Sequence, residues 1–242
     1  MVPEPNRKAV ILGVGAALLG AGTAIYAATR GGEPDVSTTE RAKIERVVRE
    51  YILANPEILL EAGDRLHAKQ ASAAVSQHRA ALERPYANAW AGAADGDVTL
   101  VEFYDYACGY CRQAVPTVDR LLAEDPKLKV VFRELPVLGP NSEAAALASL
   151  AAARTDRFKA FHNGLYAAGR PTPETVAAVA ARAGVPTTPP ADARAEIETN
   201  IRLAQAVGIT GTPGFVIGDR VIPGAVGYEE LKKAIEEARS KS

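Results

Sequence analysis

The stretch Phe103 to Pro116 reads FYDYACGYCRQAVP and holds both cysteines of the 242-residue chain, three positions apart. The apolar, β-branched run VTLVEFY at 98–104 precedes them and predicts a central strand that is covered on both faces. The cysteines then open a segment that we expect to be helical to about Ala123, with Pro116 inside it. A strand followed by a CxxC at the start of a helix is typical of a thiol redox site.

The position of the first cysteine suggests its chemistry. A sulfur at a helix N-terminus faces unpaired backbone N–H groups and the positive end of the helix dipole, which lower a cysteine pKa and favour the thiolate. We expect Cys108 to be the attacking nucleophile and Cys111, one turn later, to resolve the mixed disulfide. A structural disulfide would close too short a loop to remove much chain entropy. A pair of buried, inert thiols is a further alternative, although an oxidising compartment would act on them.

A second motif, TGTPG at 210–214, lies directly before the apolar run FVI. A proline in such a tight turn is often cis, and it would leave the Thr212 backbone free to pair with an extended peptide. The glycines also fit an ordinary turn. We therefore include Thr212 and Pro213 as candidate site residues. Glu102, six residues before Cys108, is either a buried proton carrier for the resolving thiol or a solvent-facing residue of an alternating strand.

Two other groups of residues have open interpretations. Tyr104, Tyr106 and Tyr110 surround the cysteines and form either an apolar peptide-binding surface or ordinary core and rim. His67 and His78 stand eleven residues apart on one helical face, but no third ligand accompanies them, so a solvated face is the simpler interpretation. We expect no metal and no cofactor.

The first thirty residues predict export. Arg7 and Lys8 precede an uncharged apolar run from Ala9 to Thr29, which is the pattern of a signal sequence. This run is longer than a usual cleavable core and close to the roughly 20 residues that cross a bilayer. Residues 1–30 are therefore expected to be a signal peptide, or an anchor in which residues 9–29 span the inner membrane. The predicted location is the periplasm or cell envelope.

Residues 36–84 predict a helical extension with an apolar stripe. Ser37 and Glu40 fit a capping box, and Asn55-Pro56 fits the start of a second helix, with the asparagine as its cap. The stripe of the first helix consists of Ile44, Val47, Val48, Tyr51 and Ile52. Two such helices cannot enclose a core, so they must dock on the main domain or assemble with other copies.

The main domain is expected at 92–240. The segment 84–97, with Trp90, is interpreted as a linker, and 127–135 as a second strand. Helical, alanine-rich patterns follow over 141–207, then a hairpin around Gly218-Asp219 and a last helix over 228–239. This order predicts an α/β thioredoxin fold with a large helical insertion, preceded by the N-terminal helical extension.

The charge balance excludes one class of partner. The chain has 28 basic and 29 acidic residues, no run of lysines or arginines, and 48% apolar residues. Nucleic-acid binding depends on phosphate neutralisation by a basic face. The sequence therefore predicts no nucleic-acid partner and a sizeable apolar core.

These motifs also resemble a known family. EFYDYACGYC, followed about 100 residues later by GTPGFVIG, is similar to DsbA-like thiol-disulfide oxidoreductases of the thioredoxin superfamily, over roughly Val98 to Ala238. The segment IERVVREYILANPEILLEA resembles the N-terminal extension of ScsC-type (suppressor of copper sensitivity) proteins, which can hold protomers in a trimer. The resemblance implies that Cys108 is the nucleophile, that Cys111 resolves it, and that Thr212-Pro213 faces the substrate.

The implied activity is thiol-disulfide exchange on exported proteins that contain cysteines, with a membrane thiol reductase or oxidase as redox partner. Isomerase or reductase activity is favoured, because Gly109 and Tyr110 supply no imidazole beside Cys108 to over-stabilise its thiolate. One alternative is a monomeric, membrane-anchored DsbA-like dithiol oxidase. An alternative of another class is a non-catalytic copper-binding or chaperone protein that uses the CxxC as a soft-metal clamp.

Overall fold

The computed structural model describes residues 36–241. The expected signal peptide or anchor at 1–30, including the possible span at 9–29, lies outside these residues. Within the described part of the chain, no helix combines the length and the apolar character that crossing a bilayer requires. The chain divides into two compact units, with the boundary between Leu60 and Glu61.

The first described helix is α2, Thr38–Ala54, and it begins as its sequence predicts. The Ser37 hydroxyl accepts the Glu40 N–H at 3.3 Å, and the Glu40 carboxylate accepts the Ser37 N–H at 3.1 Å, so the capping box is formed. The predicted role of Asn55 is wrong. Its side-chain amide donates to the Tyr51 carbonyl at 2.9 Å, so Asn55 ends α2 and does not cap the next helix.

The second helix, α3, covers Glu57–Glu83 and belongs in its later turns to the main domain. Val75 and Leu82 are each about 1% exposed and pack against Val101 and Phe103 of the sheet. The carbonyl groups at the C-terminal end of α3 also have a partner in that domain. Arg133, itself buried, donates to the carbonyls of Ala81, Leu82 and Arg84. A buried guanidinium thus satisfies carbonyls that the helix leaves unpaired.

A five-stranded sheet with the order β1-β3-β2-β4-β5 forms the centre of the main domain. The strands are β1 Trp90–Gly92, β2 Val98–Tyr104, β3 Leu128–Glu134, β4 Gly214–Ile217 and β5 Arg220–Pro223. The predicted strand at 98–104 is indeed central. It pairs in parallel with β3 and antiparallel with β4. The hairpin turn at Gly218 is also confirmed, and its φ of +57° suits a glycine.

The interpretation of residues 84–97 as a linker is wrong at its centre. Trp90, Ala91 and Gly92 form strand β1, which pairs antiparallel with β3 in the register Trp90↔Val131. The Phe132 N–H also donates to the Ala89 carbonyl at 3.0 Å, so the pairing continues one residue before the strand. Three residues in a run rich in glycine, alanine and aspartate are too few to show an alternating pattern.

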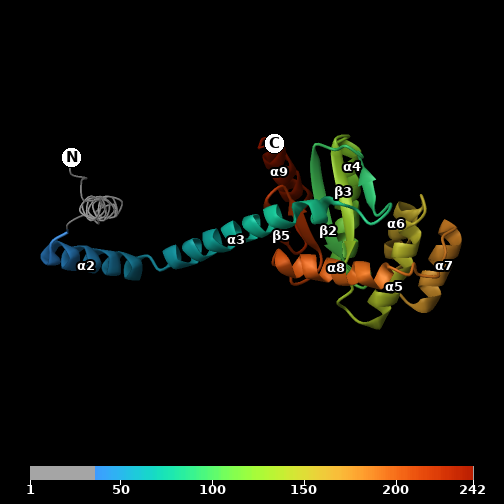
Figure 1. The fold of residues 1–242 in the computed structure, drawn as a ribbon, viewed down its shortest axis with the longest axis horizontal. Helices are drawn as coiled ribbons and strands as arrows, with labels where there is room; N and C mark the ends of the chain where they lie inside the picture. Colours follow the sequence, from blue (N-terminus) through green and yellow to red (C-terminus); the bar gives the residue numbers. More distant parts are fainter. Residues whose placement is uncertain (1–35, 242) are drawn as a thin grey trace, which may run out of the picture. The chain divides into compact units, whose positions relative to one another are not determined.

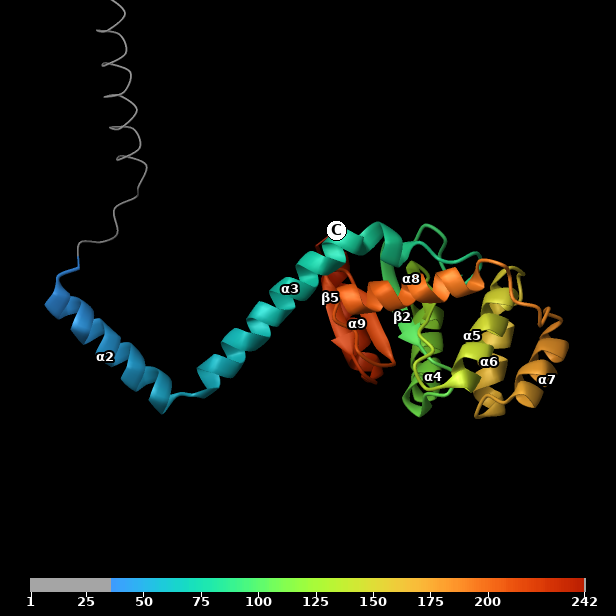
Figure 2. The same cartoon turned by 60° about the horizontal axis from the view of Figure 1, so that its bottom comes forward.

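Helices cover both faces of this sheet (Figure 1). Helices α4 (Gly109–Glu124) and α9 (Tyr228–Arg239) pack on one face, and α8 (Ala193–Ala206) and the end of α3 on the other. Helices α5 (Pro140–Ala153), α6 (Phe158–Ala168) and α7 (Pro173–Ala183) pack on one another beyond the sheet (Figure 2). The fold is the predicted mixed α/β arrangement, a thioredoxin-like sheet with a helical insertion after β3 and a helical extension before β1.

Candidate active site

Strand β2 leads directly into the turn that presents the two cysteines. Cys108 is the N-cap residue of α4, and its sulfur accepts the Cys111 N–H at a donor–acceptor distance of 3.4 Å. The turn itself is closed by the Cys108 N–H, which donates to the Asp105 carbonyl at 3.0 Å. The sulfur therefore lies at the positive end of the α4 dipole, where negative charge is stabilised.

The loop before β4 comes to the same place from 104 residues further along the chain. The Cys108 thiol donates to the Thr212 carbonyl at 3.3 Å, and the Thr212–Pro213 peptide bond is cis. This loop is held by β4, in which Gly214 pairs with Phe103 of β2. The two motifs that the sequence singles out thus meet at one sulfur atom.

The two cysteines differ in their surroundings. Cys108 is 6% exposed, whereas Cys111 is fully buried in the core below it. Burial raises the pKa of the Cys111 thiol strongly, and a hydrogen bond to the Asp105 backbone opposes this shift only in part. Both side chains are free thiols in this structure. Cys111 is therefore a neutral thiol at neutral pH, and it needs a proton acceptor before it can attack another sulfur.

Glu102 lies in the core on β2, only 3% exposed. Burial raises the pKa of its carboxyl to about 8, and the positive charge of Lys159 opposes that shift. The same carboxylate adds to the increase in the Cys111 pKa. The alternative of a solvent-facing Glu102 is wrong. The reason is that α4 and α9 cover one face of the sheet and α3 and α8 the other, so neither face of β2 is open to solvent.

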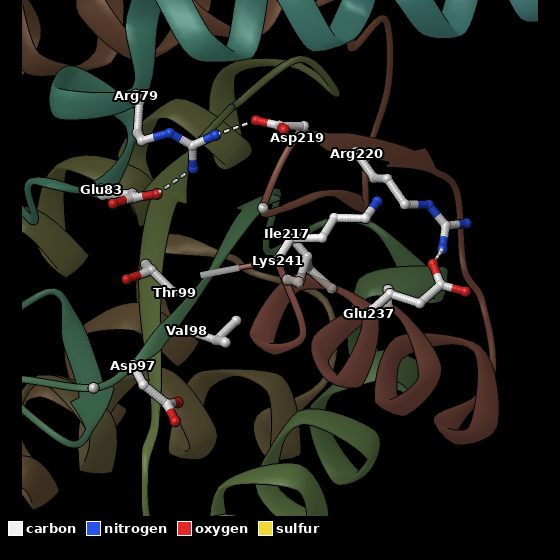
Figure 3. A pocket seen from close by; sticks show the side chains of 14 residues that line it. Arg79, Glu83, Asp97, Val98, Thr99, Ile217, Asp219, Arg220, Glu237 and Lys241 are labelled. Carbon is white, nitrogen blue, oxygen red and sulfur yellow. Dashed lines mark hydrogen bonds and ion pairs between the residues drawn. The ribbon is translucent and has the colours of Figure 1, made fainter.

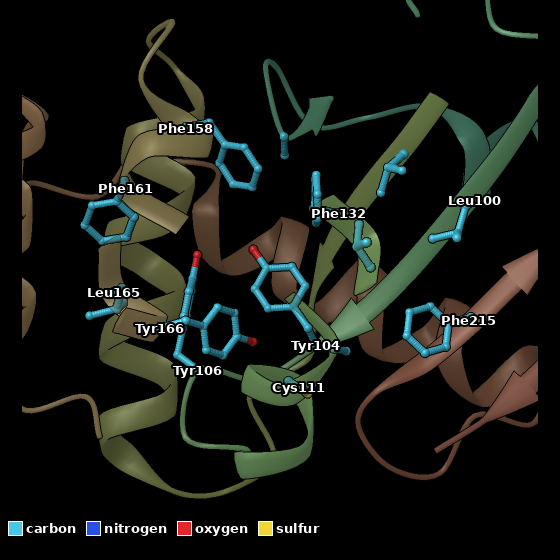
Figure 4. Close-up of a cluster of buried hydrophobic side chains, with 14 of the residues drawn as sticks. Leu100, Tyr104, Tyr106, Cys111, Phe132, Phe158, Phe161, Leu165, Tyr166 and Phe215 are labelled. Carbon is cyan, nitrogen blue, oxygen red and sulfur yellow. The ribbon is translucent and has the colours of Figure 1, made fainter. Parts of the chain in front are cut away.

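A buried cluster of aromatic and polar side chains lies beside Cys111 (Figure 4). The Tyr104 hydroxyl donates to the Glu134 carboxyl, and the Tyr106 hydroxyl lies 2.8 Å from Ser149 Oγ and 3.2 Å from His162 Nδ1. Burial raises the pKa of Glu134 well above its usual range and lowers that of His162 well below its usual range, so burial favours the neutral form of each side chain. Glu134 and His162 gave no signal in the sequence, because their partners are 30 to 56 residues away.

These contacts decide the role of the three tyrosines near the site. Tyr104 and Tyr106 are no more than 1% exposed, so they are core residues and cannot bind a peptide at the surface. Tyr110, between the cysteines, is 64% exposed. Of the three tyrosines, Tyr110 alone has an exposed side chain.

Asp105 is a site residue that the sequence analysis missed. It is 1% exposed, and its carboxylate accepts three backbone N–H groups, from Ala107 at 2.8 Å, Val137 at 2.9 Å and Leu138 at 3.0 Å. One carboxylate thus joins the turn before Cys108 to the loop that follows β3. An aspartate two residues before an N–H partner is a common turn signal, but contacts 32 residues away have none.

A hollow of about 390 Å³ lies at the opposite end of the sheet from the cysteines (Figure 3). It borders the first residues of β2 and the Gly218 turn, and Arg79 forms ion pairs there with Glu83 and Asp219. Within residues 36–241 no three His, Cys, Asp or Glu side chains are grouped so that they could hold a metal ion.

Comparison with known proteins agrees with this geometry. Residues 99–236 match the model of the DsbA-like thioredoxin domain, and this match covers more than half of the chain. The chain belongs to the DsbA-like thioredoxin family. Residues 40–73 also match the N-terminal domain of the copper resistance protein ScsC. The second match covers α2 from Glu40 onward and α3 as far as residue 73.

Solved structures of similar proteins extend the comparison. A linker-deletion mutant of Proteus mirabilis ScsC is 28% identical, with a TM-score of 0.70 over 87% of this chain and 100% of that one. A periplasmic thioredoxin-like protein of Salmonella enterica serovar Typhimurium is 34% identical, with a TM-score of 0.64 over 67% of this chain and 95% of that one. A thioredoxin-like oxidoreductase of Silicibacter pomeroyi DSS-3 is 37% identical, with a TM-score of 0.63 over 66% and 96%.

The curated relatives that match this DsbA-like chain are much longer proteins. The Na⁺/H⁺ antiporter NhaA 1 of Salinispora arenicola is 30% identical over 156 residues, which are 61% of this chain and 24% of that protein. The chain thus spans about a quarter of the length of the curated relatives it matches.

Proposed function

We propose that the protein is an exported thiol-disulfide oxidoreductase that reduces or isomerises disulfides in other proteins, with Cys108 as the nucleophile. The observation behind this proposal is the contrast between the two sulfurs. Cys108 lies at the α4 N-terminus against the Thr212 carbonyl, whereas Cys111 is fully buried one turn below. Membership of the DsbA-like family and the oxidoreductase among the solved relatives support it.

The proposed reaction has two steps, each of which breaks one disulfide bond and forms another. The Cys108 thiolate attacks one sulfur of a client disulfide, so a mixed disulfide forms and the other client sulfur leaves as a thiolate. Cys111 then loses its proton and attacks the Cys108 sulfur, which releases the reduced client and leaves a Cys108–Cys111 disulfide. In isomerisation a second client thiol attacks the mixed disulfide instead, and the protein returns to the dithiol with no net oxidation.

The remaining site residues have supporting roles in this scheme. Glu102, buried on β2 with a pKa of about 8, accepts the Cys111 proton during the second step in the fraction of molecules in which its carboxyl is ionised. The backbone of Thr212, held by the cis bond to Pro213 next to the Cys108 sulfur, pairs with the extended client chain. No metal or other cofactor enters the scheme.

The helical extension is proposed to assemble copies of the chain, with a trimer as the expected state, and the DsbA-type domain to carry its insertion at 141–207. The predicted end of the extension, given as 36–84, and the predicted start of the domain, given as 92–240, lie too late in the chain, because the main unit begins at Glu61 and its sheet includes Trp90. In α2, Ile44, Val47, Val48 and Tyr51 are all about half or more exposed, so this helix leaves an apolar face without a cover in its own unit. The match of residues 40–73 to the ScsC N-terminal domain supports assembly through this face. An assembly would shield Cys108 from re-oxidation by a membrane oxidase.

The proposed location is the periplasm or cell envelope, with a membrane thiol reductase as the partner that keeps Cys108 reduced. The periplasmic relative from Salmonella supports this location. Anchoring by residues 9–29 stays a prediction. A membrane-anchored monomeric oxidase is the competing function, and it would differ in both its oligomeric state and its direction of electron flow.

One experiment separates the two. The chain without residues 1–30 should sediment as an oligomer and restore activity to a protein with scrambled disulfides. Deletion of residues 36–60 should give a monomer that loses this isomerase activity and keeps or gains dithiol oxidation. Deletion must stop at Leu60, because Val75 and Leu82 are part of the main core. A monomer for the longer chain would overturn the isomerase proposal in favour of the oxidase.

A further inference from the structure

Asp105 contacts both cysteines through its backbone. Its carbonyl accepts the Cys108 N–H at 3.0 Å and the Tyr166 hydroxyl of α6 at 3.1 Å. A further backbone hydrogen bond of Asp105 lowers the pKa of the Cys111 thiol, against the larger effect of burial. A bond with this sign is donated by an N–H group, because a donor stabilises the thiolate. Asp105 and Tyr166 are at most 2% exposed, so water does not compete for these bonds.

The Asp105 side chain fixes this backbone to the segment that follows β3. Pairing between β2 and β3 extends to the Leu135 N–H, which donates to the Tyr104 carbonyl at 2.8 Å. Beyond this bond, the Asp105 carboxylate accepts three backbone N–H groups, from Ala107 at 2.8 Å, Val137 at 2.9 Å and Leu138 at 3.0 Å. The carboxylate thus replaces backbone pairing where the two chain segments have left the sheet, and it restricts how far Asp105 can shift.

The two steps of exchange depend on Asp105 to different degrees. In the first step the Cys108 sulfur is stabilised by the Cys111 N–H, at 3.4 Å, and by the α4 dipole, which both belong to α4. In the second step the Cys111 sulfur must approach the Cys108 sulfur along the disulfide bond that breaks. That approach depends on the relative placement of the two cysteines, and the backbone of Asp105 contacts both. A small error in the placement of reacting groups slows such a step strongly.

We propose that Asp105 is a positioning residue for the second step, in which Cys111 attacks the mixed disulfide at Cys108. This inference rests on the proposed function. The carboxylate anchors Asp105 to the loop between β3 and α5, and its backbone holds the two cysteines in the arrangement that the attack requires. Asp105 has no part in the proton transfer of this step, which belongs to Glu102.

The test separates the two steps with the symmetric disulfide of nitrothiobenzoate, a coloured leaving group. The Cys108 thiolate of the reduced protein attacks one sulfur of the reagent, and one nitrothiobenzoate leaves at a rate that rises with the reagent concentration. Cys111 then loses its proton and attacks the Cys108 sulfur. A second nitrothiobenzoate leaves at a rate independent of the reagent concentration, and the Cys108–Cys111 disulfide forms. Stopped-flow absorbance records both releases.

Asp105→Asn should change the two rates unequally. Its side chain retains one acceptor oxygen and places an amide N–H group against backbone donors, so it cannot bond Ala107 and the loop after β3 together. We expect the second release to slow about tenfold, whereas the rate constant of the first stays within about twofold of the original value. The pH dependence of Cys108 alkylation should also be unchanged, because the N-terminus of α4 is intact.

Asp125→Asn is the matched control. Asp125 also accepts the N–H two residues on, from Lys127 at 3.0 Å, but it lies at the opposite end of α4 from the cysteines. Both releases should keep their rates in this variant. Tyr166→Phe is a second probe, which spares the carboxylate and keeps the ring in the core. Because it removes a hydroxyl that holds the Asp105 carbonyl, it should slow the second release about threefold and leave the first unchanged.

The outcomes separate this inference from the proposed function. If the unmodified protein releases only one nitrothiobenzoate, Cys111 does not resolve the mixed disulfide and the proposed function fails. If Asp105→Asn leaves both rates unchanged, or slows both by the same factor, exchange stands and the positioning role of Asp105 is overturned. The same holds if Asp125→Asn also slows only the second release, because the effect is then not specific to Asp105. If Asp105→Asn does not fold, an unchanged second release in Tyr166→Phe overturns the role.

Discussion

Residues 38–60 leave apolar side chains exposed, whereas the DsbA-like domain buries even acidic ones. In α2 no residue is buried, and Ile44, Val47 and Tyr51 are more than half exposed. The main domain does the reverse. It encloses the carboxyl groups of Glu102, Asp105 and Glu134, each at most 3% exposed. Exposed apolar side chains indicate a surface that another molecule covers. Buried carboxyl groups indicate a site whose chemistry depends on burial.

The change from one region to the other occurs along a single helix. In α3, Leu59 and Leu60 are exposed, whereas Val75 and Leu82 are buried against the sheet. Both pairs are apolar residues of one predicted helical segment in the sequence. The pattern identifies which side chains need cover, but not whether the cover is the sheet or another molecule.

The largest expected effect tests whether all of the chemistry belongs to the main domain. Cys108→Ser should abolish turnover, because the attacking sulfur is gone, and Cys111→Ser should accumulate mixed disulfides with clients, because nothing resolves them. Val47→Ser in α2 is the control, and it should leave the reduction of a small disulfide unchanged. Non-reducing gel electrophoresis and mass spectrometry detect the trapped species. Trapping by Cys108→Ser, with none by Cys111→Ser, would reverse the assigned roles.

A smaller effect should separate two leucines of α3. Leu82 is 1% exposed and Leu60 is 73% exposed. Leu82→Ala should lower the free energy of unfolding of the main domain by about 2–5 kcal/mol, because it leaves a cavity in the core. Leu60→Ala should change it by less than about 0.5 kcal/mol.

Trp90 provides the measurement for both variants. It is the single tryptophan of the chain, it is part of β1, and it packs on the cluster that contains Leu82. Urea unfolding followed by its fluorescence reports on the main domain alone. Equal losses in the two variants would mean that residues 57–60 also contribute to that core.

Most of the fold followed from the sequence, and the exceptions share a physical reason. The strand at 98–104, the helix after Cys108 and the hairpin at Gly218 are set by local periodicity and turn residues, and all three were predicted. The short strand at Trp90 exists only because β3 offers it hydrogen bonds. Its sequence has no pattern of its own, so tertiary pairing decided it.

The site residues also separate into those that a local motif predicts and those that only tertiary contacts define. Cys108, Cys111 and the Thr212–Pro213 loop belong to recognisable motifs, and the structure brings them together. Asp105 was missed because two of its three backbone donors lie more than 30 residues away. The environment of Glu102 could not be decided either, because an alternating strand exposes a face only if no helix covers it.

The smallest expected effect concerns Glu102, an acid that the main domain buries in its sheet. Its pKa in the folded protein is about 8, well above the ordinary value of 4.5. The folded state therefore holds a proton that the unfolded state releases above pH 4.5. The stabilising effect of that proton is fully present below pH 4.5 and is lost as the pH rises through 8.

Glu102→Gln, which remains neutral at every pH, should remove this dependence. Relative to the unmodified protein, the variant should gain on the order of 2 kcal/mol of stability between pH 5 and pH 7. Glu230→Gln, a change at an exposed position of α9, is the control and should show no such gain. Urea unfolding at several pH values gives the difference directly. The same variant should resolve mixed disulfides more slowly, since Cys111 then lacks its proton acceptor. A Glu102→Gln curve parallel to that of the unmodified protein would mean that the carboxyl has an ordinary pKa in the fold, and a base that weak could not take the proton of the Cys111 thiol.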